Sequence, residues 1–140
     1  MILLDTSVLS RVFRRPRPGP AERAFRAAFE ALLAGDRSLG LPGIVLQEIL
    51  TGLKSEKQFL ELRGNLLAGF SIVTATLEDH VEAARLRNRC IGKGVNVSTV
   101  DCLIAASAIA GGHSLFAVDE DFEAIRRHSE LQLIGLQNLA

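Results

Sequence analysis

The hydrophobic positions along the chain follow two alternating patterns. Five short runs are almost wholly apolar and rich in branched residues, which is typical of buried strands in a parallel sheet. These runs span residues 2–4, 38–41, 70–73, 114–118 and 131–134. The longer segments between them repeat apolar residues at helical spacing, which predicts helices that face a core. They span residues 21–34, 43–53, 56–67, 77–91 and 99–110.

Local signals at the ends of these segments agree with the pattern. Ser98 precedes the last predicted helix as a good N-cap, and Gly111 and Gly112 form its stop signal. Prolines within residues 14–20 predict a loop there, because proline breaks a helix. Strands that alternate with helices predict an α/β sandwich with a mostly parallel sheet. No repeat or long linker divides residues 1–140, so we expect a single domain.

The composition fits a folded domain and excludes several other classes of protein. Of the 140 residues, 48% are hydrophobic and 23% are charged, which is too apolar for a disordered chain. No apolar run approaches the roughly 18 residues of a membrane span, and the N-terminus lacks the pattern of a secretory signal. The two cysteines make neither a disulfide framework nor a zinc site. We therefore expect a cytoplasmic protein with no membrane association.

Charge is balanced in number but not in position. The chain has 16 basic and 16 acidic residues. Six arginines and one acid lie within residues 11–26, four basic residues lie within 85–93, and four acids lie within 119–123. This segregation is compatible with a basic surface beside an acidic pocket, although each block alone also fits a solvated helix face.

Four acids occupy positions that a parallel sheet would bring together or that a helix usually fills with apolar residues. Asp5 and Asp119 directly follow the first and fourth predicted strands, at the carboxyl edge where such sheets bind ligands. Asp101 and Glu48 lie on the apolar faces of their predicted helices. Burial of a lone carboxylate is very costly, so we expect a positive partner for this group.

The sequence favours a divalent cation as that partner. No lysine or arginine lies within four residues of Asp5 or Asp101, although an ion pair with a distant arginine stays open. Oxygen ligands without a neighbouring histidine favour Mg²⁺ or Mn²⁺ over zinc. Such a cation binds phosphate oxygens and lowers the pKa of bound water. Because no Ser/His or Cys/His nucleophile is evident, we expect water to attack a phosphodiester, with raised carboxylate pKa values in the metal-free cluster.

Four segments resemble the motifs of PIN domains in their order and spacing. They are residues 3–9 (LLDTSVL), 47–50 (QEIL), 97–106 (VSTVDCLIAA) and 116–122 (FAVDEDF). The resemblance covers essentially the whole chain and is greatest to the VapC-like toxins of bacterial and archaeal toxin–antitoxin pairs. It implies a three-layer α/β/α fold around a five-stranded, mostly parallel sheet. It also implies a Mg²⁺-dependent endoribonuclease that acts as a toxin.

The resemblance further assigns roles to seven residues. Attack of water on phosphorus would leave a 5′-phosphate and a 3′-hydroxyl, with Glu48 or Asp119 as the proton acceptor. The catalytic residues implied are Asp5, Glu48, Asp101 and Asp119. The direct metal ligands implied are Asp5 and Asp101. Glu48, Asp119 and Asp121 would act through water or a second metal ion. Thr6 and Ser7 would supply hydroxyls that orient the first carboxylate.

The partners implied are an RNA substrate, a second copy of the chain in a homodimer, and a small antitoxin that could form a hetero-oligomer with it. The helical segments 21–34 and 43–67 carry more apolar residues than one inner face needs. This excess fits either an ordinary core or a groove for an antitoxin helix. The sequence leaves both interpretations open.

Two other functions also stay open on the sequence. A phosphatase or phosphotransferase could use Asp5 as its nucleophile. That class usually has a second aspartate two residues later, where this chain has Ser7. A degenerate PIN domain could bind RNA or a protein without cutting RNA, and the hint for it is Ala117, where related proteins often have a hydroxyl.

Overall fold

Five parallel strands form the centre of the molecule. The computed structural model describes residues 1–13 and 19–135, so most of the proline-rich loop predicted at 14–20 lies outside the described residues. The strands lie in the order β3-β2-β1-β4-β5, and every neighbouring pair is parallel. This arrangement confirms the predicted sheet. The strands are β1 (Ile2–Leu4), β2 (Leu39–Pro42), β3 (Ser71–Val73), β4 (Ser114–Phe116) and β5 (Gln132–Ile134).

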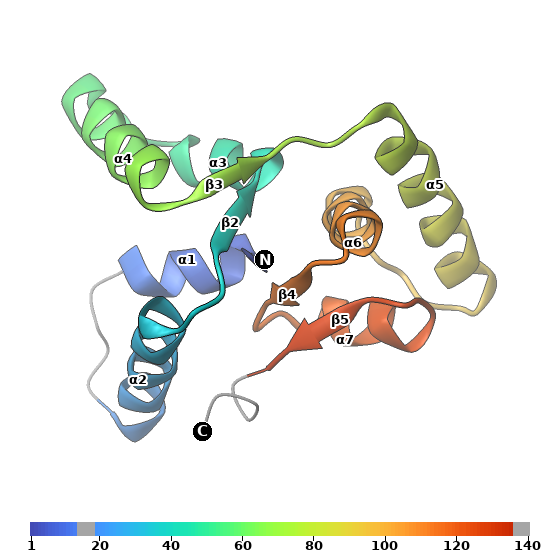
Figure 1. Cartoon of the computed structure of the whole chain (residues 1–140). Coiled ribbons are helices and arrows are strands. Elements are labelled where there is room, and N and C mark those ends of the chain that lie inside the picture. Colours follow the sequence, from blue (N-terminus) through green and yellow to red (C-terminus); the bar gives the residue numbers. More distant parts are fainter. Residues whose placement is uncertain (14–18, 136–140) are drawn as a thin grey trace.

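Helices cover both faces of this sheet in a three-layer α/β/α sandwich. Figure 1 shows the first four described helices on one side of the strands and the last three on the other. Contacts within each group, such as α1 with α3 and α5 with α6, agree with this division. The helices are α1 (Thr6–Phe13), α2 (Pro20–Ala34), α3 (Gly43–Leu50), α4 (Glu56–Gly69), α5 (Leu77–Gly92), α6 (Thr99–Gly111) and α7 (Glu120–Arg127).

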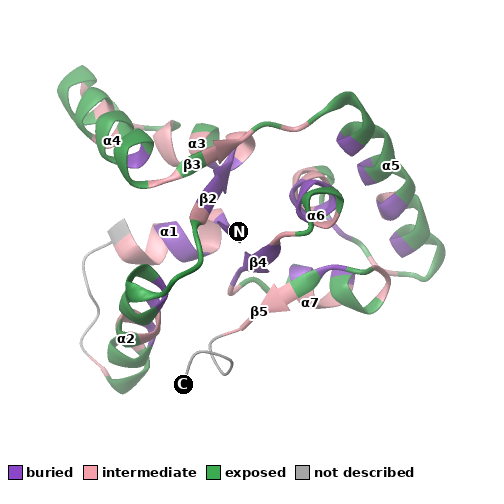
Figure 2. Cartoon of the chain, in the orientation of Figure 1, coloured by how far each residue is buried: buried purple, intermediate pink, exposed green. Residues whose placement is uncertain are grey.

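The core explains why the strands are continuously apolar. Leu3, Leu4, Leu115 and Phe116 are completely buried, since helices cover the central strands on both faces. Figure 2 shows this buried centre, with exposed positions on the outer faces of the helices. No described helix combines the length and the apolar character that a membrane span requires.

Two of the helices, α1 and α7, are not predicted by the hydrophobic pattern. In α7 the N-cap Asp119 precedes three acids in the first turn, and Arg126 and Arg127 lie in the last turn. This distribution of charge stabilises the helix dipole, and Phe122 and Ile125 bury its inner face. The acidic block at 119–123 is therefore the start of a helix as well as a charged surface.

Several element boundaries differ from the predicted ones. The prediction that Asp119 directly follows a strand is wrong, because β4 ends at Phe116 and two residues intervene. The helix predicted to reach residue 53 ends at Leu50, and Gly52 adopts a φ of 91°, which favours glycine. At α6 the prediction is confirmed: Ser98 caps the start, and Gly112 ends the helix with a φ of 66°.

Candidate metal centre

The topology of the sheet directs attention to the carboxyl ends of β1 and β4. These strands are neighbours, but the chain leaves β1 toward β2 on one side and β4 toward β5 on the other. This is the switch point at which open α/β sheets bind ligands. Asp5 follows β1 there, and its N–H donates a hydrogen bond of 3.1 Å to the carbonyl of Phe116 at the end of β4.

Asp5 is held rigidly at this point. The residue is only 5% exposed, so little of its carboxylate reaches solvent. The N–H of Ser7 donates to Asp5 Oδ2 at 3.0 Å, since α1 begins directly after the strand. Burial without a cation is costly for a carboxylate, and the hydrogen bond from Ser7 compensates part of that cost.

Asp101 approaches the same point from the first turn of α6. Its N–H donates to Ser98 Oγ at 3.0 Å, so the cap fixes the turn that carries the carboxylate. The pKa of Asp101 is raised to about 6, mainly by burial and additionally by the negative charges of Asp5 and Asp119. The expected rise in carboxylate pKa is thus confirmed for Asp101. The ionised Asp101 carboxylate therefore destabilises the folded chain, and a cation bound beside it would stabilise the fold.

The start of α7 adds two more carboxylates. Asp119 is the N-cap of this helix, and its Oδ1 accepts a hydrogen bond of 3.0 Å from the N–H of Asp121. Each of Asp101, Asp119 and Asp121 offers a carboxylate oxygen, and these three atoms lie within 4.8 Å of one another. Asp5 lies close enough to Asp101 to raise its pKa. Four of the five acids implied by the sequence therefore converge.

Glu48 lies differently from its predicted position. The sequence places it on the apolar, core-facing side of its helix, but this prediction is wrong: the residue is exposed. Thr6 Oγ1 donates a hydrogen bond of 2.9 Å to Glu48 Oε1, which connects α3 with the residue next to Asp5. Glu48 is therefore connected to the acidic cluster through Thr6 rather than through burial.

The hydroxyls of Thr6 and Ser7, the two residues after Asp5, form hydrogen bonds with distant segments of the chain. Thr6 bonds Glu48, while Ser7 Oγ accepts a hydrogen bond of 3.2 Å from the N–H of Val118. Val118 directly precedes Asp119, so Ser7 ties the start of α1 to the loop that carries a third acid. The resemblance implies that both hydroxyls orient the Asp5 carboxylate, but the hydrogen bond to Asp5 Oδ2 comes from the backbone N–H of Ser7. The partners of the two hydroxyls are distant along the chain, so the sequence does not indicate them.

No basic side chain neutralises the cluster within the part of the chain that the structure describes. The ion pairs found there join Arg11 to Glu22, Arg85 to Glu82 and Arg126 to Glu123, and none reaches the five site acids. Among the described residues, the possible metal ligands are therefore carboxylate oxygens that have no basic partner. Such a set fits a hard divalent cation such as Mg²⁺ or Mn²⁺.

Comparison with known proteins shows which family carries such a cluster of acids. The sequence matches the PIN domain family over residues 2–128. The chain belongs to the PIN domain family. The four acidic motifs of the sequence lie within this matched range, and the acids of the first, third and fourth motifs converge at the sheet edge, which agrees with the membership.

Solved structures resemble this PIN domain over nearly all of its length. VapBC2 from Rickettsia felis, bound to a DNA fragment from its promoter, shares 22% identity and a TM-score of 0.76, covering 96% of this chain and 98% of that one. A toxin–antitoxin complex from Klebsiella pneumoniae shares 22% identity and a TM-score of 0.67, with 87% and 90% covered. VapC20 from Mycobacterium tuberculosis shares 16% identity and a TM-score of 0.67, with 89% and 94% covered. These likenesses establish the shared fold.

Proposed function

We propose that this PIN domain is a Mg²⁺-dependent endoribonuclease and the toxin of a toxin–antitoxin pair. The observation that carries the proposal is the convergence of the Asp101, Asp119 and Asp121 oxygens within 4.8 Å at the switch point of the sheet. One solved relative is described as a toxin that cleaves the sarcin–ricin loop, and another as a toxin–antitoxin complex. The first description supports an RNA substrate for this chain, and the second supports an antitoxin partner.

The five site acids have different roles in the proposed hydrolysis. Asp5 and Asp101 would hold the cation directly, and Glu48, Asp119 and Asp121 would act through water or a second ion. When bound, the cation supplies a Lewis acid for the phosphate and lowers the pKa of water. Asp119 or Glu48 accepts the proton of the attacking water, and the products carry a 5′-phosphate and a 3′-hydroxyl.

Ser7 bears on the alternative of a degenerate, non-catalytic PIN domain. Ala117 has no hydroxyl with which to hold the loop that carries Asp119. However, Ser7 Oγ accepts a hydrogen bond from Val118 in that same loop. A hydroxyl from α1 thus restrains this loop, which favours a functional site over a degenerate one.

A groove between α3 and α4 supports the antitoxin partner. It has a volume of about 310 Å³ and is lined by Gly43, Leu46, Gln47, Leu50, Thr51 and Phe59. Leu46, Leu50 and Phe59 are only half-buried, whereas Phe25, Phe29 and Leu32 of α2 are buried in the core. The excess of apolar residues in the sequence therefore divides between core and groove. We propose that an apolar face of the antitoxin occupies the groove, and that the toxin forms a homodimer.

The test is RNA cleavage by the purified chain and three variants. Asp5→Asn and Asp101→Asn remove one carboxylate each, and Glu120→Gln removes an exposed charge beside the cluster as a matched control. We expect the parent and Glu120→Gln to cleave RNA with Mg²⁺ and to stop with a chelator, while both aspartate variants are inactive. The new 5′ ends should carry a phosphate. Equal cleavage by Asp5→Asn and the parent would contradict the proposal, and RNA binding without cleavage by any chain would favour the non-catalytic module.

A further inference from the structure

A small cavity between α5 and α6 has a chemistry opposite to that of the acidic cluster. Its volume is about 110 Å³, and it is lined by His80, Ala83, Ala84, Arg87, Thr99 and Leu103. Three of these side chains can donate hydrogen bonds, and none is a carboxylate. The cavity therefore offers donors together with a positive charge, which is the combination that binds a phosphate group.

Arg87 is fixed in place at this cavity by the protein itself. Its Nε donates a hydrogen bond of 3.0 Å to the carbonyl oxygen of Val97, and the residue is half-buried. No carboxylate forms an ion pair with Arg87 among residues 1–13 and 19–135. A guanidinium that is already ordered and not neutralised loses less side-chain entropy when it binds a phosphate.

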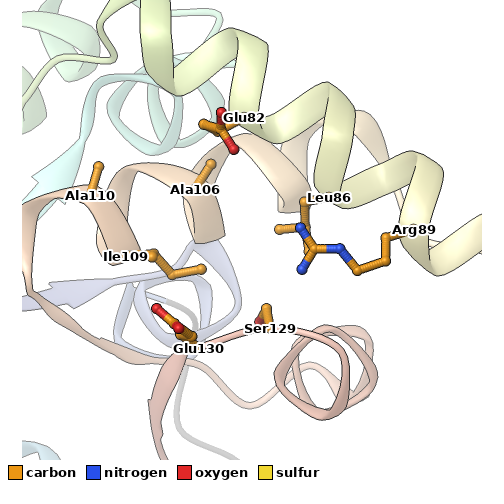
Figure 3. Close-up of a pocket in the computed structure, with 8 residues that line it drawn as sticks. All are labelled: Glu82, Leu86, Arg89, Ala106, Ile109, Ala110, Ser129 and Glu130. Carbon is orange, nitrogen blue, oxygen red and sulfur yellow. The ribbon is translucent and has the colours of Figure 1, made fainter.

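The neighbouring arginines of α5 are engaged in other ways. Arg85 forms an ion pair with Glu82 at 3.4 Å, and its side chain is 71% exposed. Arg89 donates to the carbonyl oxygen of His128 and lines a larger cavity of about 330 Å³. Figure 3 shows Glu82 and Glu130 around that larger cavity, and two carboxylates beside one guanidinium do not suit a polyanion.

The Arg87 cavity and the acidic cluster share one turn of backbone. Val97, which accepts the bond from Arg87, directly precedes Ser98, which caps α6 and fixes the N–H of Asp101. Thr99 lines the cavity, and Asp101 follows two residues later, so the two side chains leave α6 on opposite sides. An extended polyanion that passes over the start of α6 would therefore contact the cavity on one side of the helix and the carboxylates on the other.

We propose that this cavity binds a phosphate of the single-stranded RNA substrate other than the one that is cleaved. The identity of the ligand rests on the proposed function. The chain contains no Trp or Tyr, so contacts to the RNA backbone matter more here than stacking on bases. Arg87 and Thr99 then act as positioning residues that set where the strand lies relative to Asp101.

The test measures RNA affinity against salt concentration in a chain that cannot cleave. All proteins carry Asp101→Asn, and fluorescence anisotropy follows the binding of a labelled single-stranded RNA. Arg87→Gln removes the cavity charge, and Arg85→Gln removes the same charge two residues away on the same helix. Each phosphate contact contributes about 0.7 to the slope of log affinity against log salt for single strands. We expect Arg87→Gln to lower the slope by about 0.7 and Arg85→Gln to leave it unchanged.

Further variants separate a binding role from a structural one. Arg87→Lys keeps the charge but loses the geometry of the Nε bond to Val97, and it should retain most of the salt slope. Thr99→Val removes a donor without changing charge, and it should weaken binding several-fold with an unchanged slope. Thermal unfolding of each variant shows whether the fold is intact. Equal loss of slope in Arg87→Gln and Arg85→Gln, or none in either, would overturn the proposal.

The outcome is distinguishable from failure of the proposed function. If the parent does not cleave RNA but binding depends on Arg87 and not on Arg85, the phosphate site stands without the nuclease. If the parent cleaves RNA and Arg87→Gln binds it with unchanged slope, the nuclease stands and the phosphate site is refuted.

Discussion

Thr6 Oγ1 and Glu48 Oε1 are joined by a hydrogen bond of 2.9 Å across 42 positions of sequence. Thr6 is the residue after Asp5, and Glu48 lies near the end of α3, so the bond links the buried carboxylate at β1 to an exposed carboxylate on another helix. The Glu48 side chain is exposed. The hydroxyl of Thr6 therefore limits where that carboxylate can stand relative to the acidic cluster.

Removal of this hydroxyl should weaken the site without unfolding the protein. In Thr6→Val the side chain keeps its shape but no longer donates to Glu48. Loss of such an outer contact typically reduces metal affinity or activity about tenfold or more. We expect a decrease of this order in RNA cleavage, measured at several Mg²⁺ concentrations. Thr51→Val is the matched control, because Thr51 Oγ1 donates its bond to the backbone carbonyl of Gln47 in its own helix. Equal activity of both variants would refute a role for the Thr6–Glu48 bond.

Ser7→Ala should affect both stability and activity. The substitution leaves the N–H of Val118 without the Ser7 Oγ that accepts its bond at 3.2 Å. An unsatisfied donor costs about 1–3 kcal/mol, and the loop that carries Asp119 loses its restraint. We expect chemical denaturation to show a lower free energy of unfolding, together with slower RNA cleavage. Ser10→Ala on the same helix should change neither, and a parent-like Ser7→Ala would show that Ser7 does not hold this loop.

The raised pKa of Asp101 predicts how stability depends on pH in the metal-free protein. The folded pKa of about 6 lies above the ordinary value of 3.8, so the folded chain binds more protons between these limits. Stability is therefore lost as pH rises from about 4 to 6. With a chelator present, Asp101→Asn should unfold at a higher temperature than the parent at pH 8, and this difference should shrink toward pH 4.

The same substitution at an exposed aspartate controls for the loss of one charge. Asp36 lies before β2, at the edge of the sheet opposite to the cluster, and is exposed. Asp36→Asn should not reproduce the stabilisation at pH 8. A difference between Asp101→Asn and the parent that is constant from pH 4 to pH 8 would contradict the assignment of charge repulsion to Asp101.

Asp79 is a buried acid whose role is structural. Its Oδ2 accepts hydrogen bonds from the N–H of Thr76 at 3.0 Å and from Ser107 Oγ at 3.2 Å, which joins α5 to α6. Ser107→Ala removes one donor to a buried carboxylate, which should cost about 1–3 kcal/mol in the free energy of unfolding. Denaturant titration measures this loss, and RNA cleavage well below the melting temperature should be unchanged. A large loss of cleavage in a folded Ser107→Ala would show that the α5–α6 contact also serves the site.

The sequence predicts the strands well because their pattern is local. Each buried strand is a short apolar run, and neighbouring residues alone identify it. The helix α1 is missed because Thr6, Ser7 and Val8 have weak helix propensity, and burial of Val8 and Leu9 against the sheet overrides it. The helix α7 could have been found from Asp119 as a cap, followed by early acids and late arginines.

The candidate site shows where spacing stops being informative. The convergence of Asp5 and Asp101 follows from one strand end and one helix face, which the sequence contains. Asp119 joins them as the N-cap of α7, a helix that the hydrophobic pattern does not predict. The exposure of Glu48 is not predictable in this way, because helical spacing gives the side of the helix on which a residue lies but not whether another element covers that side. The bonds from Thr6 and Ser7 join segments far apart along the chain, so only the folded arrangement shows them.

Equilibrium binding of Mn²⁺ tests the central claim most directly, because it needs neither a known RNA nor an antitoxin. Isothermal titration or the electron paramagnetic resonance of free Mn²⁺ would count the ions bound by the parent, by Asp101→Asn and by Glu120→Gln. We predict at least one bound ion for the parent and for Glu120→Gln, and its loss in Asp101→Asn. Equal binding by all three chains, or none by the parent, would contradict a metal centre formed by these carboxylates.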